Sequence, residues 1–177
     1  MTVSMLAGTP HVYSRTHPNK TEEDFERMRG MLKLLDEKKG GRGHAPFIKL
    51  YEVISHLNYS DVNAMIDHAL DVRADSIEFT VVDTKPGYTD YLMLSREQRL
   101  ELYNACAEIG ERVEREKLPL DLFRFDQFMR RISTTDSDEG DYDKNIIDAL
   151  PCTVGWTFAR VLPDGNVNPC LKGHRYP

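Results

Sequence analysis

Two cysteines near the end of this 177-residue chain have a spacing suited to binding a metal centre. Cys152 and Cys170 flank a predicted hairpin, because residues 157–162 favour a strand and the Pro-Asp-Gly run at 163–165 is typical of a turn. A hairpin returns its two ends to one place, so both thiols are expected to face a common centre. Thiolates brought together in this way indicate a metal ion or an iron–sulfur cluster. The alternative is a pair of ordinary half-buried thiols.

The residues around this pair resemble the opening of a SPASM domain, the C-terminal extension of many radical SAM enzymes that carries auxiliary 4Fe–4S clusters. Cys152, Gly165 and Cys170 meet the spacing Cys-x(12)-Gly-x(4)-Cys, and the flanking residues that share the likeness are Gly155-Trp156, Phe158-Ala159-Arg160, Asp164 and Pro169. The resemblance implies that Cys152 and Cys170 are ligands of an auxiliary cluster. The family pattern continues with further cysteines that this sequence lacks, so an incomplete site is expected. A zinc site with His174 as a third ligand is the alternative, although a fourth ligand is not visible.

Composition excludes several classes of function. The formal net charge of −6 argues against non-specific nucleic-acid binding, which needs a basic surface. No apolar run approaches the roughly 20 residues of a membrane-spanning helix, and no signal peptide is evident. Three cysteines are an odd and low count, which argues against a disulfide framework and fits a reducing cytoplasm.

Strands and helices alternate along the rest of the chain. Strands are expected at 2–7, 47–55, 76–82 and 120–125. Helices are expected from Thr21 to the glycines at 40–41, from a Ser60 N-cap to about Leu70, and at 96–116 after a Ser95–Gln98 capping box. A short helical turn is expected through Met129 and Ile132. Cys106 lies on the apolar side of the third helix, so we expect it in the core.

Such alternation predicts parallel strands joined by right-handed crossovers, either in a doubly wound sheet or in part of a (β/α) barrel. Periodicity does not choose between these, although no strand is followed by a Gly-rich phosphate loop. Residues 3–9, with Tyr13 and His17-Pro18, resemble the fourth strand and loop of a radical SAM barrel, and residues 58–79 resemble its next units. The resemblance implies a partial barrel of about four β/α units at 1–132, an acidic linker at 133–150 and a truncated SPASM-like hairpin at 151–177. Trp156 and Phe158 are expected to pack around that hairpin.

Two polar residues are candidate contacts for a cofactor. Ser4 corresponds in the resemblance to a strand-four serine that contacts the ribose of S-adenosylmethionine, and the alternative is a serine packed between a strand and a helix. Asn58 lies just beyond the C-terminal end of its strand, where barrel enzymes place their sites. A turn-stabilising asparagine is the alternative there.

The family's catalytic signature, Cys-x(3)-Cys-x(2)-Cys, is absent. The resemblance therefore implies the C-terminal portion of a radical SAM/SPASM oxidoreductase that modifies a peptide or small metabolite, and we expect this portion alone to be inactive. Exposed strand edges predict a homo-oligomer or pairing with a separate N-terminal half. The alternatives are a non-catalytic metal or iron–sulfur module and a cofactor-free α/β interaction domain. The substrate is not given by the sequence.

Overall fold

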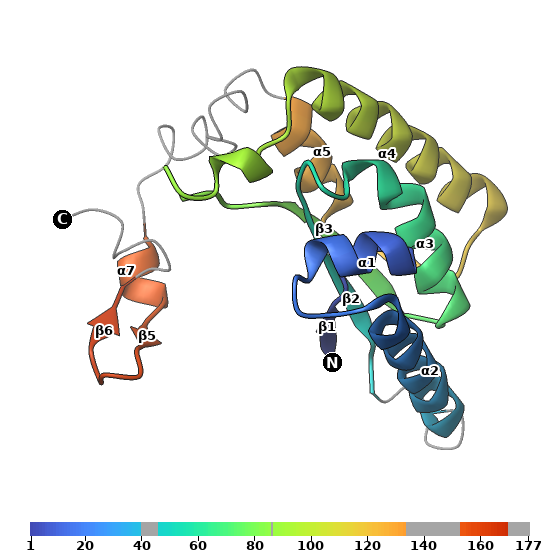
Figure 1. The fold of residues 1–177 in the computed structure, drawn as a ribbon, viewed down its shortest axis with the longest axis horizontal. Helices are drawn as coiled ribbons and strands as arrows, with labels where there is room; N and C mark the ends of the chain where they lie inside the picture. Colours follow the sequence, from blue (N-terminus) through green and yellow to red (C-terminus); the bar gives the residue numbers. More distant parts are fainter. Residues whose placement is uncertain (40–45, 86, 134–152, 170–177) are drawn as a thin grey trace. The chain divides into compact units, whose positions relative to one another are not determined.

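The computed structural model describes residues 1–39, 46–85, 87–133 and 153–169 (Figure 1). The chain divides into two compact units, Met1–Tyr142 and Asp143–Pro177. The first contains a four-stranded parallel sheet with helices, and the second contains a two-stranded antiparallel sheet. The predicted α/β class is confirmed. The predicted linker at 133–150 lies outside the described residues, apart from Ser133.

The parallel sheet has its strands in the order of the sequence. These strands are β1 (Thr2–Ser4), β2 (Lys49–Ile54), β3 (Ser76–Val81) and β4 (Asp121–Leu122). Each strand therefore lies beside the next one along the chain, which is the commonest arrangement for consecutive strands. The order never reverses, so the described sheet has no switch point of the kind that defines a doubly wound fold.

Helices fill the connections and bury one face of this sheet (Figure 1). On β2, Leu50, Glu52 and Ile54 are completely buried, whereas the alternating residues between them are only partly covered. Phe79 of β3 lies on the buried face and packs against Phe125 and Phe128. The helical segments are α1 (Pro10–Thr16), α2 (Glu22–Lys39), η1 (Tyr59–Asp61), α3 (Val62–Asp71), η2 (Asp90–Leu92), α4 (Arg96–Glu116) and α5 (Phe125–Ser133).

Helix α4 begins at the predicted capping box. The Ser95 hydroxyl accepts a hydrogen bond from the Gln98 backbone N–H at 3.2 Å, and the Gln98 side chain accepts one from the Ser95 N–H at 2.9 Å. The apolar side of the helix is buried as expected, and Cys106 is fully inaccessible to solvent within it. The prediction that Cys106 is a core residue is confirmed.

Replacing Ser95 with alanine should lower the free energy of unfolding by about 1 kcal/mol. The Gln98 N–H would lose its acceptor, and the reciprocal bond from the Ser95 N–H to the Gln98 side chain would lose its partner bond. Urea unfolding followed by circular dichroism measures this loss. Ser95→Thr keeps the hydroxyl and should remain close to the wild type. Equal losses in Ser95→Ala and Ser95→Thr would contradict a capping role for the hydroxyl.

Two predictions near the N-terminus need correction. The expected strand at 2–7 ends at Ser4, because Leu6 takes a left-handed backbone conformation with φ of 55°. The structure then forms α1, which was not predicted. Thr9 is its N-cap, accepting from the Val12 N–H, and Pro10 occupies the first turn, where its missing N–H costs nothing.

Two further boundaries differ from their predictions. Ser60 lies inside η1 rather than capping the next helix, and α3 begins at Val62 with Asp61 before it. The expected strand at 120–125 is reduced to β4, because Arg124 has a left-handed φ of 56° and α5 begins at the next residue.

In the second unit, the described residues form α7 (Val154–Thr157), β5 (Arg160–Val161) and β6 (Val167–Asn168). The hairpin is confirmed, and Gly165 supplies the positive φ of 85° in its turn. Its first strand is shorter than the predicted 157–162. Trp156 does not pack around the hairpin as expected, because it lies on α7 and is 92% exposed.

Candidate functional site

Cys152 and Cys170, the predicted metal ligands, lie outside the described residues, as does His174. The hairpin between the two cysteines does return on itself, with Arg160 paired to Asn168. A Cβ built on Gly155 would lie 3.9 Å from the Cβ of Pro169. Within the described residues, the end of the hairpin at Pro169 therefore returns close to its beginning at Gly155.

Within the described ranges, no group of three or more His, Cys, Asp or Glu side chains is placed to hold a metal ion. Of the three cysteines, Cys106 lies within the described residues. Burial raises the pKa of its thiol to about 12. A thiol with so high a pKa stays protonated at neutral pH, whereas metal binding and nucleophilic attack require the thiolate. Cys106 therefore belongs to the core rather than to a site.

Ser4 lies on the face of the sheet opposite the fully buried one. It pairs in register with Tyr51, which in turn pairs with Glu78, so the three side chains form one row across three strands. Glu78 also forms an ion pair with Lys49, whose ammonium lies 2.6 Å from its carboxylate and 4.6 Å from the centre of the Phe123 ring. Ser4 is exposed rather than packed against a helix. This row offers hydroxyl groups and a charge pair to a bound polar molecule.

Asn58 is completely buried beneath the ends of β1 and β2. Its carbonyl oxygen accepts from the Ser55 N–H at 2.8 Å, and its amide donates to the backbone oxygens of Leu6 and Val53, both at 2.9 Å. These bonds use the acceptor and both donors of the side chain. They support the turn-stabilising alternative, and a contact between Asn58 and a cofactor stays a prediction.

Replacing Asn58 with alanine should cost about 2–3 kcal/mol in the free energy of unfolding, because the buried Leu6 and Val53 oxygens and the Ser55 N–H lose their partner. Chemical denaturation of the purified chain measures the effect. Asn63 is exposed on α3 and provides a matched control, for which alanine should change stability little. A small effect at Asn58 would mean that water satisfies these backbone groups.

A buried pair of carboxyl groups was missed by the sequence analysis. Glu52 on β2 is fully buried, and burial raises its pKa to about 8, with the charge of Asp61 acting in the same direction. Asp61 is nearly buried and accepts a hydrogen bond from the Gly8 N–H at 2.7 Å. The signal for Glu52 was present, because strict alternation places it on the same strand face as Leu50 and Ile54.

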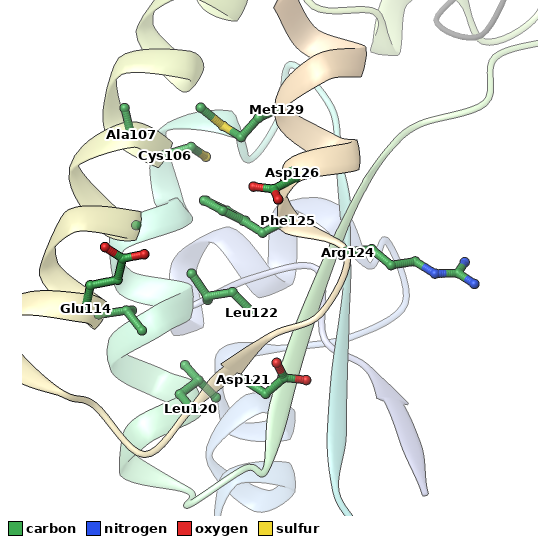
Figure 2. Close-up of a pocket in the computed structure, with 12 residues that line it drawn as sticks. Cys106, Ala107, Glu114, Leu120, Asp121, Leu122, Arg124, Phe125, Asp126 and Met129 are labelled. Carbon is green, nitrogen blue, oxygen red and sulfur yellow. The ribbon is translucent and has the colours of Figure 1, made fainter. Parts of the chain in front are cut away.

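A groove of about 660 Å³ lies between α4 and α5, beside β4 (Figure 2). Leu120, Leu122 and Phe125 contribute apolar surface, and Cys106 lies at its wall. Figure 2 shows the Arg124 side chain extending away from the other lining residues. The groove holds none of the predicted site residues, and it lies apart from the row that contains Ser4.

No family model matches this chain, and neither a curated protein nor a solved structure matches it. Its function must therefore be inferred from its own residues and geometry. Among the helices that the structure describes, none is both long enough and apolar enough to cross a membrane.

Proposed function

We propose that this chain is the C-terminal portion of a radical SAM/SPASM oxidoreductase. In this role it contributes part of a (β/α) barrel and ligands of an auxiliary 4Fe–4S cluster to the modification of a peptide or small metabolite. The reductive cleavage of S-adenosylmethionine would require a three-cysteine motif outside this sequence, since Cys106, Cys152 and Cys170 are too far apart to imitate it.

The observation that carries this proposal is the consecutive order of the parallel sheet. Four strands in sequence order, with the helix-covered face of β2 fully buried, are the arrangement expected of adjacent units of a barrel. A doubly wound nucleotide-binding sheet would instead reverse its order at the ligand crevice. The face opposite the buried one would then become the interior of the closed barrel.

The two candidate cofactor contacts, Ser4 and Asn58, fit a polar ligand unequally well. Ser4 is exposed at the C-terminal end of β1, in the row with Tyr51 and Glu78, so its hydroxyl is available to the ribose of S-adenosylmethionine. Asn58 does not fit, because its amide is buried and already bonded to backbone groups. We therefore retain Ser4 as a candidate cofactor contact, and assign Asn58 to the support of the strand ends.

Cluster binding by the hairpin is the part of the proposal that the isolated chain can test. The chain should be reconstituted anaerobically with iron and sulfide, and then analysed for visible absorption, iron and zinc. We expect bound iron and sulfide in the wild type, and their loss in Cys152→Ser and Cys170→Ser. Cys106→Ala is the matched control, since it removes a core thiol and should leave the iron content unchanged.

Other outcomes of this experiment would support the competing functions. Stoichiometric zinc that is lost in the same two variants would indicate a non-catalytic metal module. A protein that binds neither metal, and whose cysteine variants behave like the wild type, would contradict cluster binding and favour an interaction domain.

We further propose that the sheet is completed by a partner, either a second copy or a separate N-terminal half. β1 and β4 are the edge strands of the described sheet, and an unpaired strand edge is a template for another chain. Light scattering after size-exclusion chromatography should give a mass above 20.4 kDa for the isolated chain. A stable monomer at high concentration would contradict self-association, and co-purification with a protein carrying the three-cysteine motif would identify the other partner.

A further inference from the structure

The groove between α4 and α5 combines an apolar lining with negative charge. Three of its apolar side chains are only partly buried, namely those of Leu122, Phe125 and Met129. Each of the three elements around the groove also contributes one exposed carboxylate: Glu114 from α4, Asp121 from β4 and Asp126 from α5. The groove therefore offers apolar contact area and negative charge to the same occupant.

The three carboxylates are not neutralised within the part of the chain that the structure describes, since none of them forms an ion pair there. By contrast, Asp71 on α3 pairs with both Arg29 and Lys33. Arg124 is the one cationic side chain among the described lining residues, and Figure 2 shows it extending away from the others. Its Cζ lies 5.1 Å from the centre of the Phe123 ring. The negative charge of the groove is thus left for an occupant to balance.

This charge narrows the choice of occupant. A second copy of the chain that met the groove through the same face would bring two sets of carboxylates together. Nucleic acid and anionic lipid carry charge of the same sign as the groove, and the whole chain has a formal net charge of −6. A cationic occupant is the class that gains from these carboxylates.

The shape of the groove favours a segment of a protein over a small molecule. Its volume is about 660 Å³, but it is an open groove rather than an enclosed cavity. Small-molecule sites usually bury about 70–90% of the ligand surface. The wall formed by α4 runs from Cys106 to Glu114, which is about 12 Å or two helical turns at about 1.5 Å per residue. Ala107 and Gly110 lie along this wall, and such small residues allow another helix to approach closely.

We propose that this groove is the docking site for a basic amphipathic helix of a partner protein. Apolar side chains on one face of that helix would cover Leu122, Phe125 and Met129. Flanking Lys or Arg side chains would reach Glu114 and Asp126, which come from the two facing helices (Figure 2). The apolar contacts supply most of the affinity, whereas the charges set the orientation and select the partner. This inference does not rest on the proposed enzymatic function, because the groove contains none of the residues predicted for that site.

Two matched peptides test the proposal on the full chain. The first is a fluorescein-labelled helical peptide of about 15 residues, with leucines at i, i+3, i+4 and i+7 and lysines beside them. The second keeps the leucines and replaces every lysine with glutamate. Fluorescence anisotropy should show binding of the lysine peptide, and binding of the glutamate peptide about tenfold weaker or not measurable. Higher salt should weaken the lysine peptide, because the carboxylates are exposed to solvent.

Variants of the chain show whether the peptide occupies this groove. The triple variant Glu114→Gln, Asp121→Asn, Asp126→Asn keeps the shape of the groove, and should weaken binding of the lysine peptide about tenfold and remove its salt dependence. Glu111→Gln is the matched control, since Glu111 is exposed on α4 but does not line the groove. Ala107→Arg places a bulky cation at an exposed position of the wall, and should abolish binding without disturbing the core.

Several results would overturn the proposal. One is the absence of lysine-peptide binding to the wild type, and another is equal binding of the two peptides; neither result depends on the folding of a variant. Binding that persists in both the triple variant and Ala107→Arg would place the peptide elsewhere on the chain. A wild-type dimer that Ala107→Arg converts to a monomer would assign the groove to a second copy instead.

Discussion

Replacing Gly8 with alanine should destabilise the first unit by about 3 kcal/mol or more, or prevent it from folding. The Cβ would lie 2.1 Å from the carbonyl carbon of Ala64 and from the nitrogen of Met65, both of which are backbone atoms. Backbone in the first turn of α3 cannot rotate away as a flexible side chain would, so the loop or the helix must move. Forced overpacking of this kind typically costs about 1–3 kcal/mol and more where backbone is displaced.

Urea unfolding gives the size of this loss, and Gly30→Ala is the matched control. Gly30 lies in the middle of α2, and a Cβ there meets nothing within 4 Å. Alanine at that position should stabilise the protein by about 0.5–1 kcal/mol, because glycine is a poor helix former. A Gly8→Ala protein as stable as the wild type would show that the β1 loop and α3 are not held as closely as described.

Protonation of His68 should destabilise the protein as the pH falls below 6.5. His68 on α3 is 5% exposed, its ring centre lies 4.9 Å from that of Phe25, and its Nε2 has no hydrogen-bond partner among the described residues. Burial therefore lowers its pKa from 6.5 to about 4. Between these two values the unfolded chain binds a proton that the folded one does not, so stability rises with pH. The complete effect is about 3 kcal/mol.

The measurement is the free energy of unfolding at several pH values, for the wild type and for His68→Gln. The variant should lose the part of the slope that lies between about pH 6.5 and pH 4, whatever its absolute stability. Asp71 titrates below this window, because its hydrogen bond with Arg29 lowers its pKa to about 2. Glu52 has the opposite slope from about pH 4.5 to 8, so the comparison is best made in a Glu52→Gln background. Identical slopes with and without His68 would be inconsistent with its buried neutral state.

Sequence patterns predicted those elements whose ends are marked by capping residues. The Ser95–Gln98 box located the start of α4 because its two reciprocal hydrogen bonds depend only on residues close in sequence. The short helix α1 was missed, although Thr9-Pro10 is a typical helix start. Left-handed Leu6 and Arg124, which end β1 and β4, carry no such signal, since neither residue type favours that conformation.

The candidate sites were predicted unevenly, for physical reasons. Ser4 follows from strand alternation, whereas the partners of Asn58 depend on how the ends of β1 and β2 meet. Glu52 lies on β2, Asp61 lies on η1, and Asp61 accepts a hydrogen bond from the Gly8 backbone after β1. Three separate segments meet here, so the pair could be found only in the tertiary structure. Cys152 and Cys170 stay a prediction, because they lie outside the described residues.

The buried thiol of Cys106 can report on the opening of the groove between α4 and α5. Because the side chain is inaccessible and its pKa is raised to about 12, alkylating reagents should label it only when this region opens. In a Cys152→Ser, Cys170→Ser protein it would be the single thiol of the chain. Its labelling rate would then time the separation of two helices without a dye, a tag or a ligand.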